Sequence, residues 1–236
     1  FYMGGDQDLR GFDIRSASPW AFIATTTSIA LQNPDGTPVP RDPSNPRQGA
    51  ITIPIPVQTL VAPGGDTNIV SNLEYRIPLV GPVNLAPFVD FGMNFAARNS
   101  QLRISEAAFA QLTSTSFGCS GLDVTFNCIP SIAPGSVPFK QELQIIPATN
   151  YVRRMSSGVE VQVMMPVINA PFRVYWAYNP LRLDTNAPTP SLITRDMFPP
   201  GAAGDYTFQQ TLRGFFPSYS LREPRKTFRF TVSTTF

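Results

Sequence analysis

Apolar residues recur at every second position in five stretches of this chain, and this period constrains the fold more than any other feature. In the last stretch, Phe228, Phe230 and Phe236 share one face, while Arg229 and Thr231 share the other. The same alternation runs through residues 69–79, 83–95, 159–167 and 172–181. Side chains of a strand point alternately to its two faces, so the pattern predicts five strands with one apolar and one polar face.

The connections separate two folds that share this pattern. A soluble sandwich and a membrane barrel both alternate apolar and polar residues. Residues 80–82 and 168–171 are short turns, whereas residues 96–152 and 182–224 form long loops. Short turns at one end, long loops at the other and aromatic residues near strand ends are typical of outer-membrane proteins. We therefore predict an all-β protein, a transmembrane antiparallel β-barrel with long extracellular loops.

Prolines and strand number qualify this prediction. Pro87 lies inside a predicted strand, where it cannot donate to the ladder, and we expect a bulge to absorb it. Pro54 and Pro56 make residues 50–60 a poor strand by the same argument. Because about eight strands are needed to close a barrel, five leave it open. We expect the missing strands to come from an N-terminal part of a parent protein or from further copies of the chain.

Composition excludes several classes of function. The chain has no histidine, which excludes histidine-dependent triads and histidine-bound zinc. Its 18 basic and 16 acidic residues are mostly scattered, which argues against a nucleic-acid partner. We expect no catalytic residues, no metal and no cofactor. Cys119 and Cys128 lack the spacing of redox or zinc motifs, and we predict a disulfide that closes a loop; two unrelated buried thiols are the alternative.

The sequence FYMGGDQDLRGF at residues 1–12 resembles the sixth extracellular loop of BamA-type outer-membrane insertases. That loop is marked by an aromatic residue, two glycines and an (L/V)RGF tetrapeptide. The similarity continues along the chain in the order of the last strands of that family. The matching segments are GGDTNIVSNLEYRIPL at 64–79, FVDFGMNF at 88–95, RRMSSGVEVQVMMPV at 153–167, FRVYWAYNPL at 172–181 and FRFTVSTTF at 228–236.

This resemblance implies the last five strands of a barrel of about sixteen strands. It implies folding and insertion of barrel proteins into the bacterial outer membrane, without covalent chemistry, in a family related to bacterial surface antigens. The implied partners are outer-membrane lipids, unfolded outer-membrane proteins, POTRA domains and assembly lipoproteins. Phe228, Phe230 and the terminal Phe236 would form the β-signal of outer-membrane proteins. A passive pore or polypeptide transporter of the same superfamily, and a soluble β-sandwich binding protein, are the alternatives.

Arg10 is the principal candidate site residue. Glu74 and Asp90 lie on the polar, lumen-facing sides of two strands joined by a tight turn, so one guanidinium could bridge both. The resemblance assigns the same partners. Gly11 lets the backbone approach the wall, and Phe12 is expected to stack against it. We predict a lumenal latch formed by these five residues; a solvated loop arginine is the alternative.

Other charges have structural interpretations. Arg173 and Arg229 are expected to line the lumen with Glu160 as a ladder. Tyr151, Arg153 and Arg154 are expected near a rim, at a solvated strand end; binding of lipopolysaccharide phosphates is the alternative. We expect six segments in one C-terminal barrel portion. They are the loop region at 1–66, two strands at 67–95, a long loop with the cysteine pair at 96–152, two strands at 153–181, a long loop at 182–224 and the terminal strand at 225–236.

Overall fold

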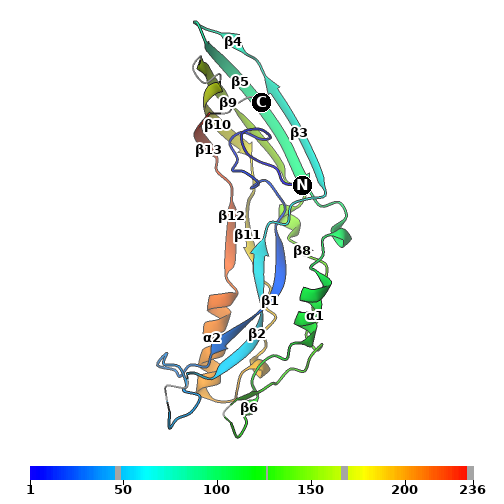
Figure 1. Cartoon of the computed structure of the whole chain (residues 1–236), viewed down its shortest axis with the longest axis vertical. Helices are drawn as coiled ribbons and strands as arrows, with labels where there is room; N and C mark the ends of the chain where they lie inside the picture. The colour runs from blue at the N-terminus through cyan, green and yellow to red at the C-terminus, as the bar shows by residue number, and fades with distance from the viewer. Residues whose placement is uncertain (46–48, 126, 166–169, 233–236) are drawn as a thin grey trace.

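The computed structural model describes residues 1–45, 49–125, 127–165 and 170–232. One curved antiparallel sheet contains strands at all five predicted positions, in the order β13-β10-β9-β5-β3 (Figure 1). These strands are β3 (Thr67–Glu74), β5 (Val83–Phe95), β9 (Arg153–Met165), β10 (Ala170–Leu181) and β13 (Lys226–Val232), and the short β4 (Ile77–Pro78) also pairs with β5. The period of two therefore identified the strands, and the all-β class is confirmed.

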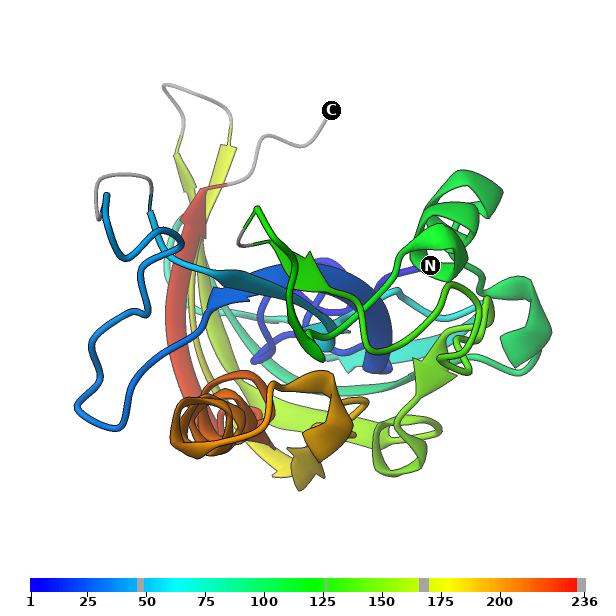
Figure 2. The same cartoon turned by 90° about the horizontal axis from the view of Figure 1, so that it is seen from below.

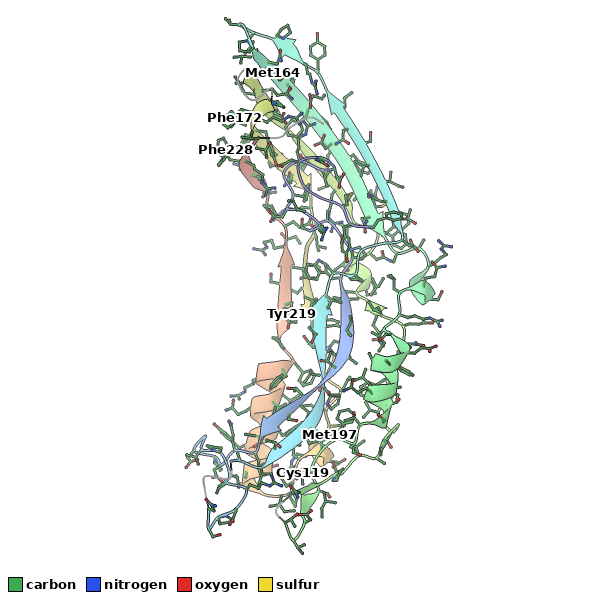
Figure 3. The ribbon with its side chains drawn as sticks, in the orientation of Figure 1. Cys119, Met164, Phe172, Met197, Tyr219 and Phe228 are labelled. Carbon is green, nitrogen blue, oxygen red and sulfur yellow. A yellow bond between two sulfur atoms is a disulfide. The ribbon has the colours of Figure 1, made fainter. Side chains whose placement is uncertain are left out.

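The two faces of this sheet have the polarity expected of a membrane wall. On the outer face, the residues Leu73, Phe228 and Phe230 are 72%, 70% and 68% exposed. Figure 3 shows Phe228 on the side of the sheet that faces away from the rest of the chain. On the inner face, Asp90 and Glu160 are buried. This arrangement is the reverse of a water-soluble fold, because the outer face meets lipid instead of water.

Pro87 interrupts the pairing of its neighbours without ending its own strand. The carbonyl of Pro87 accepts from Tyr75 N at 3.1 Å, so its nitrogen also faces that strand, where it has no hydrogen to donate. The partner strand is divided at this point into β3 and β4, while the register stays the same on both sides. The expected bulge is therefore absent, and a break in the neighbouring strand takes its place.

The predicted long loops fold into a second body, which we call the cap (Figure 1). Its apolar core includes Ile53, Ile55, Phe117, Met197 and Phe198, drawn from three segments far apart in the sequence. Its main elements are β1 (Ala21–Ala30), β2 (Thr52–Val61), α1 (Glu106–Ser114), β8 (Gln144–Ile145), β11 (Asp184–Pro188), α2 (Ala202–Phe215) and β12 (Ser218–Arg222). Its small elements are β6 (Gly121–Leu122), β7 (Cys128–Ile129), η2 (Asn99–Gln101), η3 (Pro147–Thr149) and η4 (Arg195–Met197). None of the helices in the described ranges is long and apolar enough to cross a membrane.

The expectation that Pro54 and Pro56 disfavour a strand was wrong. Both lie within β2, which pairs with β1 over its whole length. Leu31 N donates to Ile51 O at 2.8 Å, so odd-numbered residues exchange the hydrogen bonds of this antiparallel pair. The two prolines are even-numbered and their nitrogens face outward, so the ladder loses no donor.

The predicted disulfide between Cys119 and Cys128 is confirmed. It joins the two sides of the hairpin formed by β6 and β7. Cys119 N also donates to Met197 O at 2.9 Å, and Figure 3 shows both side chains together in the lower part of the cap. The bond therefore attaches a small hairpin to the core of the cap.

We expect Leu73→Arg to weaken insertion of the protein into lipid vesicles, because Leu73 projects from the outer face. An arginine on the lipid-facing side of a membrane barrel costs about 2–4 kcal/mol near the bilayer midplane. Urea-dependent folding into vesicles would measure the loss. Val124→Arg, at a fully open position of the cap, is the matched control and should have no effect. Equal behaviour of the two variants would contradict the membrane assignment of this face.

Candidate functional site

Residues 1–19, which we call the inner loop, lie against the concave face of the sheet (Figures 1 and 2). The terminal amine of Phe1 donates to Gly65 O at 2.6 Å, and Gly65 N donates back to Phe1 O at 2.9 Å. The loop has a small apolar cluster of its own, which consists of Met3, Leu9, Phe12 and Ala17, all fully buried. The loop is thus a folded unit that the sheet encloses on one side.

Arg10 projects from this loop onto two carboxylates of the wall. Its Nε and Nη2 donate to the two oxygens of Asp90, each at 2.8 Å, which is the bidentate geometry that favours arginine. Its Nη1 donates to Glu74 Oε2 at 2.6 Å. The backbone N–H of Arg10 also donates to Asp90, at 3.1 Å. The structure therefore brings Arg10, Glu74 and Asp90 together, on the loop, β3 and β5.

Glu160 of β9 is a third acceptor, which the sequence interpretation assigned only to a ladder with Arg173 and Arg229. Arg10 Nη1 lies 3.2 Å from Glu160 Oε2, and the carboxylate is almost fully buried. The sequence indicated that Glu160 faces inward on the next strand, but not that it contacts Arg10. That contact depends on the pairing of β5 with β9. Arg76 and Arg173 approach Glu74 and Glu160, so three guanidinium groups balance three carboxylates.

The cluster is buried, so each of its charges depends on its partners. The side chain of Arg10 is only 7% exposed, while Asp90 and Glu160 are sealed from solvent. The guanidinium carbon also lies 3.8 Å from the centre of the Phe88 ring, a cation–π contact that covers one face of the charge. Charges in such a place are tolerated because each has hydrogen-bonded partners of opposite sign. Phe88 was not identified from the sequence.

Gly11 lies close to the wall. Its carbonyl accepts from Asn179 Nδ2 at 2.8 Å and from Thr227 Oγ1 at 2.7 Å. A Cβ at this position would lie 2.5 Å from Asn179 Oδ1, and the φ of +86° also favours glycine. The expected close approach is therefore present. Phe12, in contrast, packs in the apolar cluster of the inner loop, where Leu9 and Met3 surround it.

A second contact joins the loop to the last two strands. Tyr175 Oη donates to Asp6 Oδ1 at 2.5 Å, and Arg229 pairs with Asp6 and Asp13. The expected ladder is thus only partly correct. Arg173 lies 3.5 Å from Glu160, but Arg229 is turned to the acids of the inner loop. Together with the contacts of Arg10, these contacts attach the inner loop to all five long strands of the sheet.

Arg154 does not lie in solvent as expected. It is fully buried at the start of β9, and its Nε donates to Glu223 Oε1 at 2.8 Å. Leu183 N donates to the other oxygen of Glu223 at 2.7 Å. Burial raises the pKa of the Glu223 carboxyl, and the charge of Arg154 opposes that shift. This pair joins the sheet to the base of the cap, whereas Arg153 is exposed as expected.

The two β-signal candidates that the structure describes, Phe228 and Phe230, lie on the outer face of β13; Phe236 lies outside the described residues. An exposed apolar wall, a buried polar inner face and a loop held within it define a protein of the outer-membrane β-barrel class. The sequence matches the Omp85 superfamily domain over residues 1–236, and the chain belongs to that superfamily. The superfamily comprises insertases and transporters of the bacterial outer membrane that act on unfolded polypeptides. No curated protein and no solved structure matches the chain.

We expect Arg10→Ala to lower the free energy of unfolding by about 3–5 kcal/mol, because it leaves buried carboxylates without their counter-ion. Arg10→Lys should restore only part of this stability, since an ammonium lacks the planar fork. Urea unfolding in detergent or vesicles would measure both. Arg76→Ala is the matched control, because Arg76 binds the same Glu74 from an exposed position and should contribute less than about 1 kcal/mol.

The double variant Glu74→Ala and Asp90→Ala tests the shared contact. Its loss of stability should be smaller than the sum of the two single losses, because both carboxylates bind one guanidinium. Additive losses would show that the two carboxylates act independently of Arg10.

We expect Gly11→Ala to destabilise the inner loop by about 1–3 kcal/mol, because the new methyl group meets Asn179 and the backbone is left-handed. Gly49→Ala separates the two causes. Gly49 has a φ of +87°, close to that of Gly11, but none of the described residues lies within 4 Å of the place that its methyl group would take. Thermal unfolding of both variants would show a larger loss at Gly11; equal losses would leave no role for the close approach.

Proposed function

We propose that this chain is the C-terminal barrel portion of an insertase that folds β-barrel proteins and inserts them into the outer membrane. The observation that carries the proposal is the attachment of Arg10 to carboxylates of three adjacent strands. A wide barrel has no apolar core beneath its wall, so polar contacts must hold the strands in register. A loop that joins them gives a rigid wall against which the other side of the barrel can move.

The open sheet needs further strands for this function. The described strands end at β3 on one side and β13 on the other, and about eight strands are the minimum for a closed barrel. Unpaired strand edges in lipid leave backbone groups without partners, so we propose that strands of a parent protein complete the wall, to about sixteen. Copies of the chain are the other source of strands. The edge of β13 is the proposed template for a substrate strand, because its alternation matches that of the strands it would pair with.

The proposed activity involves no covalent step, no metal and no cofactor. In the network around Arg10, the donors and acceptors serve to hold a loop, and the carboxylates are occupied by guanidinium groups. Binding and folding require a surface and a rigid frame, and these are what the network stabilises. The proposed partners are unfolded outer-membrane proteins and lipids, with POTRA domains and assembly lipoproteins attached to the parent protein.

In cells, Arg10→Ala should reduce the amount of folded barrel proteins in the outer membrane several-fold when the variant replaces the native copy. The measurement is the heat-modifiable, folded fraction of several barrel proteins, normalised to the amount of variant present in the membrane. Arg76→Ala should leave that fraction unchanged. If barrel proteins are unaffected while export of one secreted polypeptide fails, the protein is a transporter and the insertase proposal is wrong.

A further inference from the structure

The cap contains a strand edge with free hydrogen-bonding groups. Strand β1 pairs with β2 on one side, and the bond from Leu31 N to Ile51 O fixes which residues face that partner. Odd-numbered residues face β2, so the backbone groups of Ala24, Thr26, Ser28 and Ala30 face the other side. Among the described residues, none of the backbone N–H and C=O groups of these four residues has a hydrogen-bond partner on that side.

Both ends of the same edge are occupied. At one end, Phe22 pairs with Gln144 of β8, and Trp20 O accepts from Ile146 N at 2.8 Å. At the other end, Gln32 N donates to Thr207 Oγ1 of α2 at 2.8 Å, and that hydroxyl also contacts Gln32 O. The free stretch is therefore bounded, and it has the length of a short strand.

The opposite edge of this hairpin is protected. Pro54 and Pro56 of β2 face outward and have no N–H to offer, and Pro54 O accepts from Gly118 N at 2.8 Å. Prolines and charges are the usual means by which proteins block free strand edges. The free edge of β1 has neither, since residues 23–30 read IATTTSIA, and Thr26 and Ser28 are exposed.

Two hollows border residues 25–30 of the free stretch, while a third, beside Ala24, is lined partly by Lys140 and Glu142. One, of about 360 Å³, is lined by Thr25 to Thr27 and by Phe215 and Tyr219, and the other, of about 440 Å³, by Ser28 to Ala30, Thr211 and Phe215. In the part of the chain that the structure describes, no charged side chain lines either hollow. Hydroxyl and aromatic groups with no net charge accommodate uncharged side chains better than acidic or basic ones.

We propose that residues 24–30 of β1 bind an extended, uncharged segment of a separate polypeptide, which adds a strand to the cap. The inference is independent of whether the barrel is an insertase or a transporter. Free donors and acceptors that alternate along a strand match the backbone of another extended peptide, and the hollows take its side chains. A second copy of β1 fits this edge less well, because β8 and α2 occupy both ends of it.

The test uses the whole protein in detergent and a short, capped peptide of alternating threonine and valine as the probe. Binding should protect the amides of Thr26 and Ser28 from hydrogen exchange. The double variant Thr26→Pro and Ser28→Pro removes two outward donors without breaking the β1–β2 ladder, and should weaken binding at least about tenfold. The matched control, Thr26→Val with Ser28→Ala, changes the same side chains, keeps both donors and should bind normally.

A second arm does not depend on the folding of the proline variant. The same peptide, N-methylated on every residue, should fail to bind the unaltered protein, because neither of its edges can donate to a ladder with β1. Equal binding of the methylated and unmethylated peptides would overturn the proposal. Absence of protection at Thr26 and Ser28 would also overturn it. If the peptide does not bind and the unaltered protein instead forms an oligomer that the proline variant abolishes, the edge binds a second copy of the chain and the proposal is wrong.

Discussion

The ion cluster around Arg10 is the interaction on which the inner side of this structure depends. One guanidinium from the inner loop binds carboxylates on β3, β5 and β9, and the ring of Phe88 covers it. Each charge would be costly in this buried place without its partners, so the loop and the three strands depend on one another for stability. Such a network substitutes for the apolar core that a wall between lipid and a lumen does not have.

The sheet and the cap have opposite distributions of apolar and polar side chains. The sheet exposes its apolar side chains and buries its polar ones, whereas the cap has an ordinary apolar core that includes Ile53, Phe117 and Met197. Figure 1 shows the two parts stacked along the long axis of the molecule. The buried pair of Arg154 and Glu223 lies at their junction, and the disulfide lies within the cap. The long connections are therefore a folded extension of the wall.

Membership of the Omp85 superfamily relates this arrangement to the function of outer-membrane insertases and transporters. These proteins must keep a wide wall stable while polypeptides cross or join it. A loop that binds several strands from within stabilises that part of the wall. The cap adds a second edge outside the sheet, where backbone groups of β1 have no partner among the described residues, while Pro54 and Pro56 protect the edge of β2.

The sequence by itself determined the five strands of the sheet, because a period of two is a local property of the chain. It also determined that Glu74 and Asp90 both face the polar side of the sheet, because strand parity follows from numbering. The spacing of Cys119 and Cys128 predicted their bond. Tertiary structure alone decided that Glu160 joins the cluster, that Arg154 is buried, and that the loops form a core. Those facts depend on strand register and on contacts between segments far apart in sequence, and a local pattern carries no information about either.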